Sequence, residues 1–125
     1  MITYKVLVNS EGNREWYMND KLHREDGPAV EYFGGDKEWY INGERHRLDG
    51  PAIEDRDGYK AWYLNGKRHR LDGPAVEFEG IYKEWYIEGN KLTQDEFNRQ
   101  TAPAIEYTVA QLEELLGKRI KIVGE

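Results

Sequence analysis

Histidine, arginine and aspartate recur together three times in this chain, in the order His-Arg-x-Asp. The copies begin at His23, His46 and His69, and Gly-Pro follows each of them. An imidazole close to a carboxylate could bind a metal ion or act as an acid–base pair. The basic side chains could instead bind an anion such as a phosphate group. We call this set the His-Arg ridge, and its members are His23, Arg24, Arg45, His46, Arg47, Arg68, His69 and Arg70.

The spacing of these copies limits their chemistry. They lie 23 residues apart, and a constant step this short is typical of a repeat protein. If each unit supplies two strands about 4.8 Å apart, equivalent histidines lie about 10 Å from one another. Zinc–nitrogen bonds are about 2.0–2.1 Å long, so these histidines cannot share one ion. We therefore expect each histidine to pack on or hydrogen-bond to a neighbouring unit, Asp49 to brace the bend, and the protein to need no metal, cofactor or catalytic residue.

Each unit is predicted to be a β-hairpin that begins with a Trp-Tyr strand. Asn-Gly at 42–43 and 65–66 favours a type I′ turn, which needs positive φ at both central residues. Weaker versions of the turn are Asn19-Asp20 and Glu88-Gly89. The returning strand bends at Asp-Gly-Pro, because proline cannot donate to a ladder and glycine relaxes φ. We expect no helix between residues 12 and 87.

Alternation along a strand sorts the side chains onto two faces. One face is predicted to be the core, and in the second unit it carries Trp39, Ile41 and Ile53. The opposite face is predicted to be solvated, and in the same unit it carries Glu38, Tyr40, Ala52 and Glu54. Tyrosine is favoured at interfaces, although ordinary cross-strand pairing gives the same pattern. The candidates for a binding face are Tyr17, Tyr40, Tyr63, Tyr86, Glu31, Glu54 and Glu77.

The two ends of the chain depart from the repeat. Residues 1–12, with a strand at 2–8, read as an N-terminal half-repeat cap, and residues 13–89 hold three full repeats and the start of a fourth. Residues 90–125 are predicted to form a C-terminal cap. Thr93 with Glu96 and Thr108 with Gln111 are capping boxes that begin two helices, and Gly117 suits the end of the second. A last strand is predicted at 119–123.

These elements define the expected fold class. We predict a mainly β, single-domain protein spanning residues 1–125: a single-sheet antiparallel β-hairpin solenoid with a small α/β C-terminal cap. A thin repeat protein agrees with a charged fraction of 34%, a mean hydropathy of −0.92 and an aromatic content of 13%.

The overall charge and the missing residue types narrow the function. A net charge of −6 opposes binding to duplex nucleic acid or to an anionic membrane. The chain has no cysteine, which rules out disulfides and thiolate chemistry. It shows neither a signal peptide nor an apolar run long enough to span a membrane. We therefore expect a cytoplasmic protein, in the cytoplasm of the host cell if a phage encodes it.

The unit resembles a MORN repeat over about residues 12–89. It shares the step of 23, the aromatic first strand, the Asn-Gly turn and the later Asp-Gly turn, as in Trp62…Asn65-Gly66-Lys67-Arg68-His69. It is most similar to MORN variants of bacterial and phage proteins. The pattern Trp-Tyr-x-Asn-Gly-x-x-His-Arg-x-Asp-Gly-Pro-Ala, with a Leu-Thr-x-x-Glu-Phe tail, also looks like uncharacterised tailed-phage proteins. The resemblance implies a phage origin and a hairpin solenoid.

Two functions remain open from the sequence. The first is a non-catalytic scaffold that binds another protein, such as a host defence factor that it modulates. The second is a binder, or a hydrolase, of a small phosphorylated ligand such as a nucleotide at the His-Arg ridge. No single polar cluster stands out from the repetition, which favours the first function. The sequence is also compatible with a homodimer.

Overall fold

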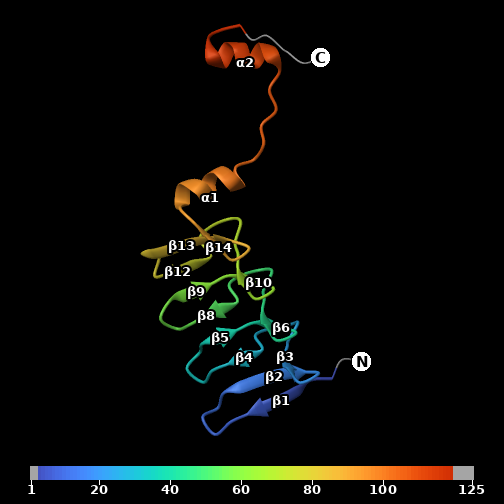
Figure 1. Ribbon diagram of the computed structural model, residues 1–125. Helices are drawn as coiled ribbons and strands as arrows, with labels where there is room; N and C mark the ends of the chain where they lie inside the picture. Colours follow the sequence, from blue (N-terminus) through green and yellow to red (C-terminus); the bar gives the residue numbers. More distant parts are fainter. Residues whose placement is uncertain (1–2, 120–125) are drawn as a thin grey trace.

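The computed structural model of the protein describes residues 3–119, in which antiparallel strands dominate (Figure 1). Two short helices follow the strands, α1 (Gln94–Thr101) and α2 (Val109–Leu116). The strands are β1 (Lys5–Val8), β2 (Arg14–Met18), β3 (Lys21–Leu22), β4 (Val30–Glu31), β5 (Lys37–Glu38), β6 (Tyr40–Ile41), β7 (Glu44–Arg45), β8 (Ile53–Glu54), β9 (Tyr59–Ala61), β10 (Tyr63–Leu64), β11 (Lys67–Arg68), β12 (Val76–Phe78), β13 (Tyr82–Ile87) and β14 (Asn90–Leu92).

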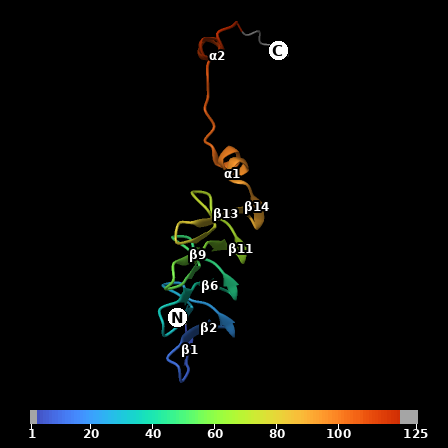
Figure 2. The same ribbon diagram turned by 90° about the vertical axis from the view of Figure 1, so that its left-hand side faces the viewer.

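One long sheet runs the length of the strand region. Its order is β1-β2-β4-β5-β8-β9-β12-β13-β14, and β3 pairs with β2 beside this path. The sheet is not closed, since β1 and β14 lie at opposite ends of the order. Two further hairpins, β6-β7 and β10-β11, form separate two-stranded sheets. Figure 2 shows the strands stacked one above another along the molecule.

The predicted hairpin turns are confirmed at all four positions. β2 turns into β3 at Asn19-Asp20, and β13 turns into β14 at Glu88-Gly89. The turns at 42–43 and 65–66 close β6-β7 and β10-β11. Both central residues have positive φ in every turn, for example 50° at Asn42 and 82° at Gly43. The prediction of no helix between residues 12 and 87 is also confirmed.

A break at the tryptophan splits the first strand of the two middle units. Trp39 lies between β5 and β6, and its backbone N–H donates to the carbonyl of Ala52 at 2.7 Å. Its carbonyl accepts from the amide of His46 at 3.1 Å, on the opposite side. Each middle unit therefore contributes one part to the long sheet and another part to a two-stranded hairpin.

The predicted register across the bend is wrong by one residue. In the long sheet Glu38 lies opposite Ile53, and Lys37 lies opposite Glu54. Residues that face each other in a ladder point to the same side, so Ile53 shares the face of Glu38 and not that of Trp39. Alternation does not carry through the bend between β7 and β8, and a slip of one residue moves every side chain to the other face.

The same register corrects the three candidate glutamates. Glu54 lies opposite Lys37, and Glu77 lies opposite Lys60. Each of these lysines is two residues before a tryptophan and therefore on the same face as that tryptophan. Glu31 also pairs with Lys37. All three glutamates therefore lie on the face that carries the tryptophans, which we call the tryptophan face.

Burial also differs from the prediction. Small residues on the tryptophan face, such as Ala52, are fully buried, whereas Trp39 and Trp62 are only half-buried. The face expected to be solvated holds part of the core, because Val30, Tyr63 and Val76 are buried there. We call it the tyrosine face. It carries Glu15, Tyr17, Tyr32, Glu38, Tyr40, Tyr59, Ala61, Tyr63, Phe78, Tyr82, Glu84 and Tyr86.

Both predicted helices begin at their capping boxes. Thr93 and Glu96 start α1, and Thr108 and Gln111 start α2, which ends at Gly117 with φ 68°. α1 packs on β13 and β14 and buries Phe97. α2 lies apart from the strands, at the end of an extended segment (Figures 1 and 2). The last predicted strand, 119–123, falls largely outside the described residues, as does the start of the strand at 2–8.

Candidate functional site

The arginine of each His-Arg-x-Asp motif lies on the tryptophan of its own unit. In the second unit the Arg47 guanidinium carbon is 3.8 Å from the centroid of the Trp39 ring. Arg47 Nε donates to Asp49 Oδ1 at 2.9 Å, and Nη1 donates to the Pro51 carbonyl at 3.0 Å. Nη1 also reaches Glu54 Oε1 at 3.2 Å. The hydrogen bond from Arg47 lowers the pKa of the Asp49 carboxyl.

The first and third units repeat this arrangement. Arg24 lies 4.0 Å from the Trp16 ring and Arg70 lies 3.8 Å from the Trp62 ring. Their Nε atoms donate to Asp26 and Asp72, and their Nη1 atoms donate to the carbonyls of the two following prolines. Only about a fifth of each arginine side chain is exposed. These three arginines are therefore bound within their own units.

The histidines connect each unit to the next. Asn42 donates its backbone N–H to His23 Nδ1 at 2.9 Å, and Asn65 donates to His46 Nδ1 at 3.0 Å. Glu88 makes the same bond to His69 at 2.9 Å. The hydrogen bonds confirm the prediction that each histidine contacts a neighbouring unit. In all three rings Nδ1 is the acceptor of the bond.

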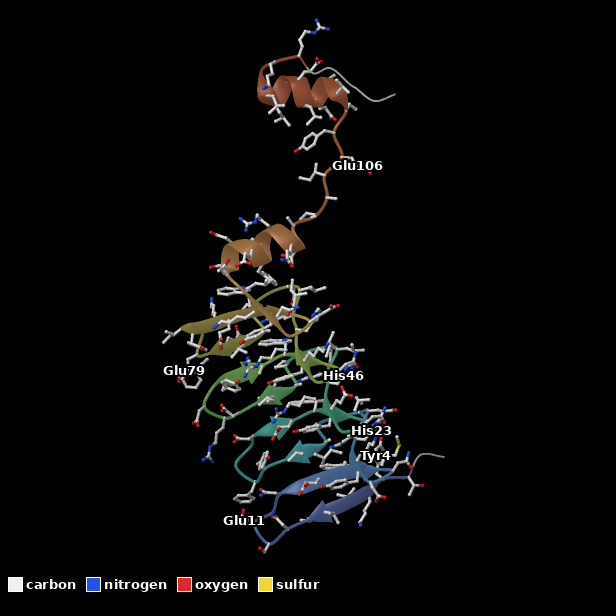
Figure 3. The ribbon with its side chains drawn as sticks, in the orientation of Figure 1. Tyr4, Glu11, His23, His46, Glu79 and Glu106 are labelled. Atoms are coloured by element: carbon white, nitrogen blue, oxygen red, sulfur yellow. The ribbon has the colours of Figure 1, made fainter. Side chains whose placement is uncertain are left out.

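His23 differs from the other two histidines in burial. Only 2% of it is exposed, and the ring of Tyr4 from the N-terminal segment stacks beside it with 6.4 Å between centroids. Tyr4, His23 and His46 lie along the same side of the molecule (Figure 3). Within the His-Arg ridge, the histidines thus make contacts at the unit boundaries, and the three arginines that follow them make contacts inside their units.

Open grooves separate the neighbouring bends. Trp39 and Ile41 line one groove, together with Arg47 and Leu48. The next groove is lined by Trp62, Leu64, Arg70 and Leu71. Leu48 is 83% exposed. The grooves offer apolar surface, while the arginines beside them already hold carboxylates.

Hydrogen bonds on the tyrosine face join tyrosines to glutamates two residues earlier. Tyr40 donates to Glu38 at 2.9 Å, and Tyr17 donates to Glu15 at 2.6 Å. Tyr86 donates to Glu84 at 3.2 Å. The same-face spacing of i and i+2 in a strand could have revealed these pairs in the sequence.

Hydrogen bonds to Glu15 and Glu38 raise the pKa of the tyrosines that donate to them. Tyr32 donates to Glu38 at 2.7 Å, and this bond, with burial and the negative charge of Glu38, raises the pKa of Tyr32 to about 12. Burial and then the bond to Glu38 raise the pKa of Tyr40. Tyr32 and Tyr40 therefore both direct their hydroxyl protons at Glu38.

Basic side chains complete the tyrosine face, and they differ between units. Arg45 in the second unit binds Glu38 at 3.3 Å, and Lys91 in the fourth unit binds Glu84 at 2.8 Å. The first unit has Leu22 at the equivalent position. Arg68 in the third unit donates instead to the hydroxyls of Tyr63 and Tyr86, each at 3.2 Å.

Within residues 3–119, no group of three or more His, Cys, Asp or Glu side chains is placed to hold a metal ion. No helix in this part of the chain is long and apolar enough to cross a membrane. Comparison with family models, curated proteins and solved structures finds no match.

Proposed function

We propose that this protein is a non-catalytic scaffold, a MORN-like hairpin solenoid, that binds another protein through its tyrosine face. One observation carries the proposal: the histidine, arginine and aspartate of each His-Arg-x-Asp motif are used in contacts within and between units. Arg47 holds its own bend, and His46 holds the turn of the next unit. Motif side chains that are already paired make a poor receptor, whereas the tyrosine face varies from unit to unit.

The composition of the tyrosine face supports a protein partner. Tyrosine, phenylalanine and arginine are enriched at protein interfaces, and tyrosine and arginine dominate binding energy there. Three aromatic side chains of this face are substantially exposed: Tyr32 (41%), Phe78 (37%) and Tyr82 (52%). Hydrogen bonds to glutamates restrain Tyr32 and Tyr40 before a partner arrives, which lowers the entropy lost on binding.

Repetition supports the solenoid. The same backbone bond joins each turn to the unit before it: Gly43 to Leu22, Gly66 to Arg45, and Gly89 to Arg68, at 2.8–2.9 Å. Units that contact only their neighbours in one repeated manner are the defining property of solenoids. The resemblance to phage proteins directs the search for a partner to host factors, including components of host defence.

Capture from a host lysate, followed by an affinity measurement with the captured protein, tests the proposal. We expect Phe78→Ser/Tyr82→Ser to weaken that affinity by about tenfold or more, because exposed aromatics contribute strongly to interfaces. The matched control is Leu48→Ser/Leu71→Ser, which removes exposed apolar groups from the groove side. If the leucine variant loses binding and the aromatic variant keeps it, the tyrosine face is the wrong surface.

The grooves favour a second candidate function, binding of a small phosphorylated ligand beside Arg47 and Arg70. They are open and lined by these arginines. A bound ligand would have to displace Asp49 or Asp72, which hold the guanidinium groups at 2.9 Å. A thermal-shift screen with nucleotides and divalent metal ions tests this function, since a ligand that prefers the folded state raises the melting temperature.

A further inference from the structure

We propose that Arg68 is a receptor for a carboxylate group that the partner protein supplies. The inference rests on the proposed function and names the chemistry of the partner at one position of the tyrosine face. The other three units carry a carboxylate at one position of this face. The third unit lacks that carboxylate but keeps a basic residue, Arg68, where two of the other units have Arg45 and Lys91.

Comparison of equivalent positions shows the gap. The step of 23 residues aligns Glu15, Glu38, Ala61 and Glu84. Glu38 forms an ion pair with Arg45, and Glu84 forms an ion pair with Lys91. In the third unit, alanine takes the place of glutamate and is fully buried between Ile53 and Val76. Arg68 therefore stands where its equivalents hold a carboxylate, and it has none of its own.

Arg68 is nevertheless held in one place. Its Nε donates to the Tyr63 hydroxyl and its Nη1 donates to the Tyr86 hydroxyl. The guanidinium carbon lies 5.3 Å from the centroid of the Tyr86 ring. Among the residues described, no carboxylate lies within ion-pairing distance of Arg68, although its side chain is only partly exposed. A guanidinium restrained by phenols and lacking a counter-charge is prepared to receive an anion.

The remaining donors match a carboxylate. Arg68 makes no bond through Nη2 to any described residue, and the Tyr63 hydroxyl accepts from Nε while keeping its own proton. The fork of a guanidinium binds the two oxygens of a carboxylate in parallel, and a charge-assisted bond is about twice as strong as a neutral one. Tyr59, Phe78 and Tyr82 lie on the same face, farther along these strands, and add aromatic surface to it.

A protein side chain is a better source of this anion than a small phosphate compound. The other units show that a glutamate carboxylate fits beside the equivalent cation, as Glu38 does beside Arg45. Arg68 lines none of the five grooves described for this protein. An open, aromatic surface with one restrained cation suits an acidic residue at the centre of a protein interface.

Arginine side-chain NMR tests the assignment with a defined probe. An acetylated triglutamate amide is titrated into the full-length protein, and the Nε–H signals of Arg45 and Arg68 are followed. We expect a saturable shift of the Arg68 signal and none of the Arg45 signal, because Glu38 already occupies Arg45. The triglutamine amide should leave both signals unchanged. An unchanged Arg68 signal at saturating triglutamate overturns the proposal, as does tighter binding of inorganic phosphate than of triglutamate.

Two substitutions exchange the presence of the carboxylate between the second and third units. Ala61→Glu supplies the missing carboxylate and should abolish the shift at Arg68. Glu38→Ala removes the carboxylate of the second unit and should create a new shift at Arg45. Since Ala61 is buried, Ala61→Glu could fail to fold; Arg68→Gln then tests the same point, and Glu38→Ala tests it with no change near Arg68. Binding to Arg68 that survives Ala61→Glu in a folded protein contradicts the inference.

The outcomes also separate this inference from the proposed function. A captured partner whose affinity falls with Phe78→Ser/Tyr82→Ser but is unchanged by Ala61→Glu and Arg68→Gln supports the scaffold and refutes the carboxylate receptor. The opposite outcome is a saturable triglutamate shift at Arg68 together with a captured partner whose affinity does not depend on the tyrosine face. That outcome refutes the proposed binding surface but supports Arg68 as a carboxylate receptor. We expect Ala61→Glu to weaken binding of the partner by about tenfold, the value of one charge-assisted hydrogen bond.

Discussion

The two faces of the long sheet differ in how constant their side-chain contacts are from unit to unit. On the tryptophan face, three units share one set of contacts, in which arginine covers tryptophan and binds the aspartate of its own bend. On the tyrosine face, the residue opposite the tyrosine changes from Leu22 to Arg45, Arg68 and Lys91. Contacts that are identical in every unit build the fold, and positions that vary between units are free to serve a partner.

The largest expected effect belongs to the tryptophan face. Trp39→Ala should lower the free energy of unfolding by about 3 kcal/mol, the lower end for large aromatic side chains, because Trp39 is half-buried. Trp85→Ala is the matched control, since the fourth unit has no arginine to cover its tryptophan. Chemical denaturation measures both. Equal losses for Trp39 and Trp85 would show that the arginine adds nothing to the tryptophan face.

Replacing the covering arginine should have a smaller effect. Arg47→Met keeps the apolar stem but removes the guanidinium from Trp39 and from Asp49, and we expect a loss of about 2 kcal/mol. Arg47→Lys should recover little of it, since an ammonium group cannot stack and bind two oxygens as a guanidinium does. Arg45→Met on the tyrosine face should cost less than Arg47→Met in the same denaturation experiment. The reverse order would contradict the division between the faces.

The histidines should rank by burial. His23→Ala should cost about 1–2 kcal/mol, because it removes the partner of the Asn42 N–H and a side chain that is 2% exposed. His46→Ala should cost less, since water can reach the amide of Asn65. Thermal unfolding of both variants gives the ranking. Neither variant should reduce partner binding beyond its folded fraction; lost binding in a protein that melts like the wild type would place the functional site on the His-Arg ridge.

The smallest expected effect is on the free energy of unfolding at alkaline pH. The pKa of Tyr32 is raised from about 10 to about 12, so the folded state keeps this proton longer than the unfolded state does. Stability from this group is complete below pH 10 and decreases as pH rises toward 12. Tyr32→Phe should therefore flatten the decline of the unfolding free energy between pH 10 and 12. An identical slope in both proteins would mean that the bond to Glu38 is not kept in solution.

The turns and helix starts could be predicted because their causes are local. Asn-Gly adopts positive φ wherever it occurs, and Thr93 with Glu96 caps a helix through neighbouring backbone groups. The register beyond the bend could not be predicted. It depends on how Asp-Gly-Pro turns the chain in space, and the periodicity of either strand carries no information about that turn.

The site residues divide in the same way. The spacing of His46 predicted a contact between units, and the structure provides it through Asn65. The stacking of Arg47 on Trp39 was missed, although both residue types recur together in the first three units and that co-occurrence was a usable signal. The exception at Ala61 was also visible in the sequence. Its meaning required the structure, because only the register places Ala61 beside the cation of its own unit.

The bond from each turn to the preceding unit has a consequence for how this chain can change over evolutionary time. Gly43, Gly66 and Gly89 each donate a backbone hydrogen bond to the equivalent carbonyl one unit earlier. At each of these junctions a second hydrogen bond joins the turn to the histidine Nδ1 of the earlier unit. A gene duplication that inserted one whole unit would reproduce both bonds at the new junction and would need no contact that the chain lacks. Length can therefore change in steps of one unit, while an insertion of any other size would move a turn away from its acceptor.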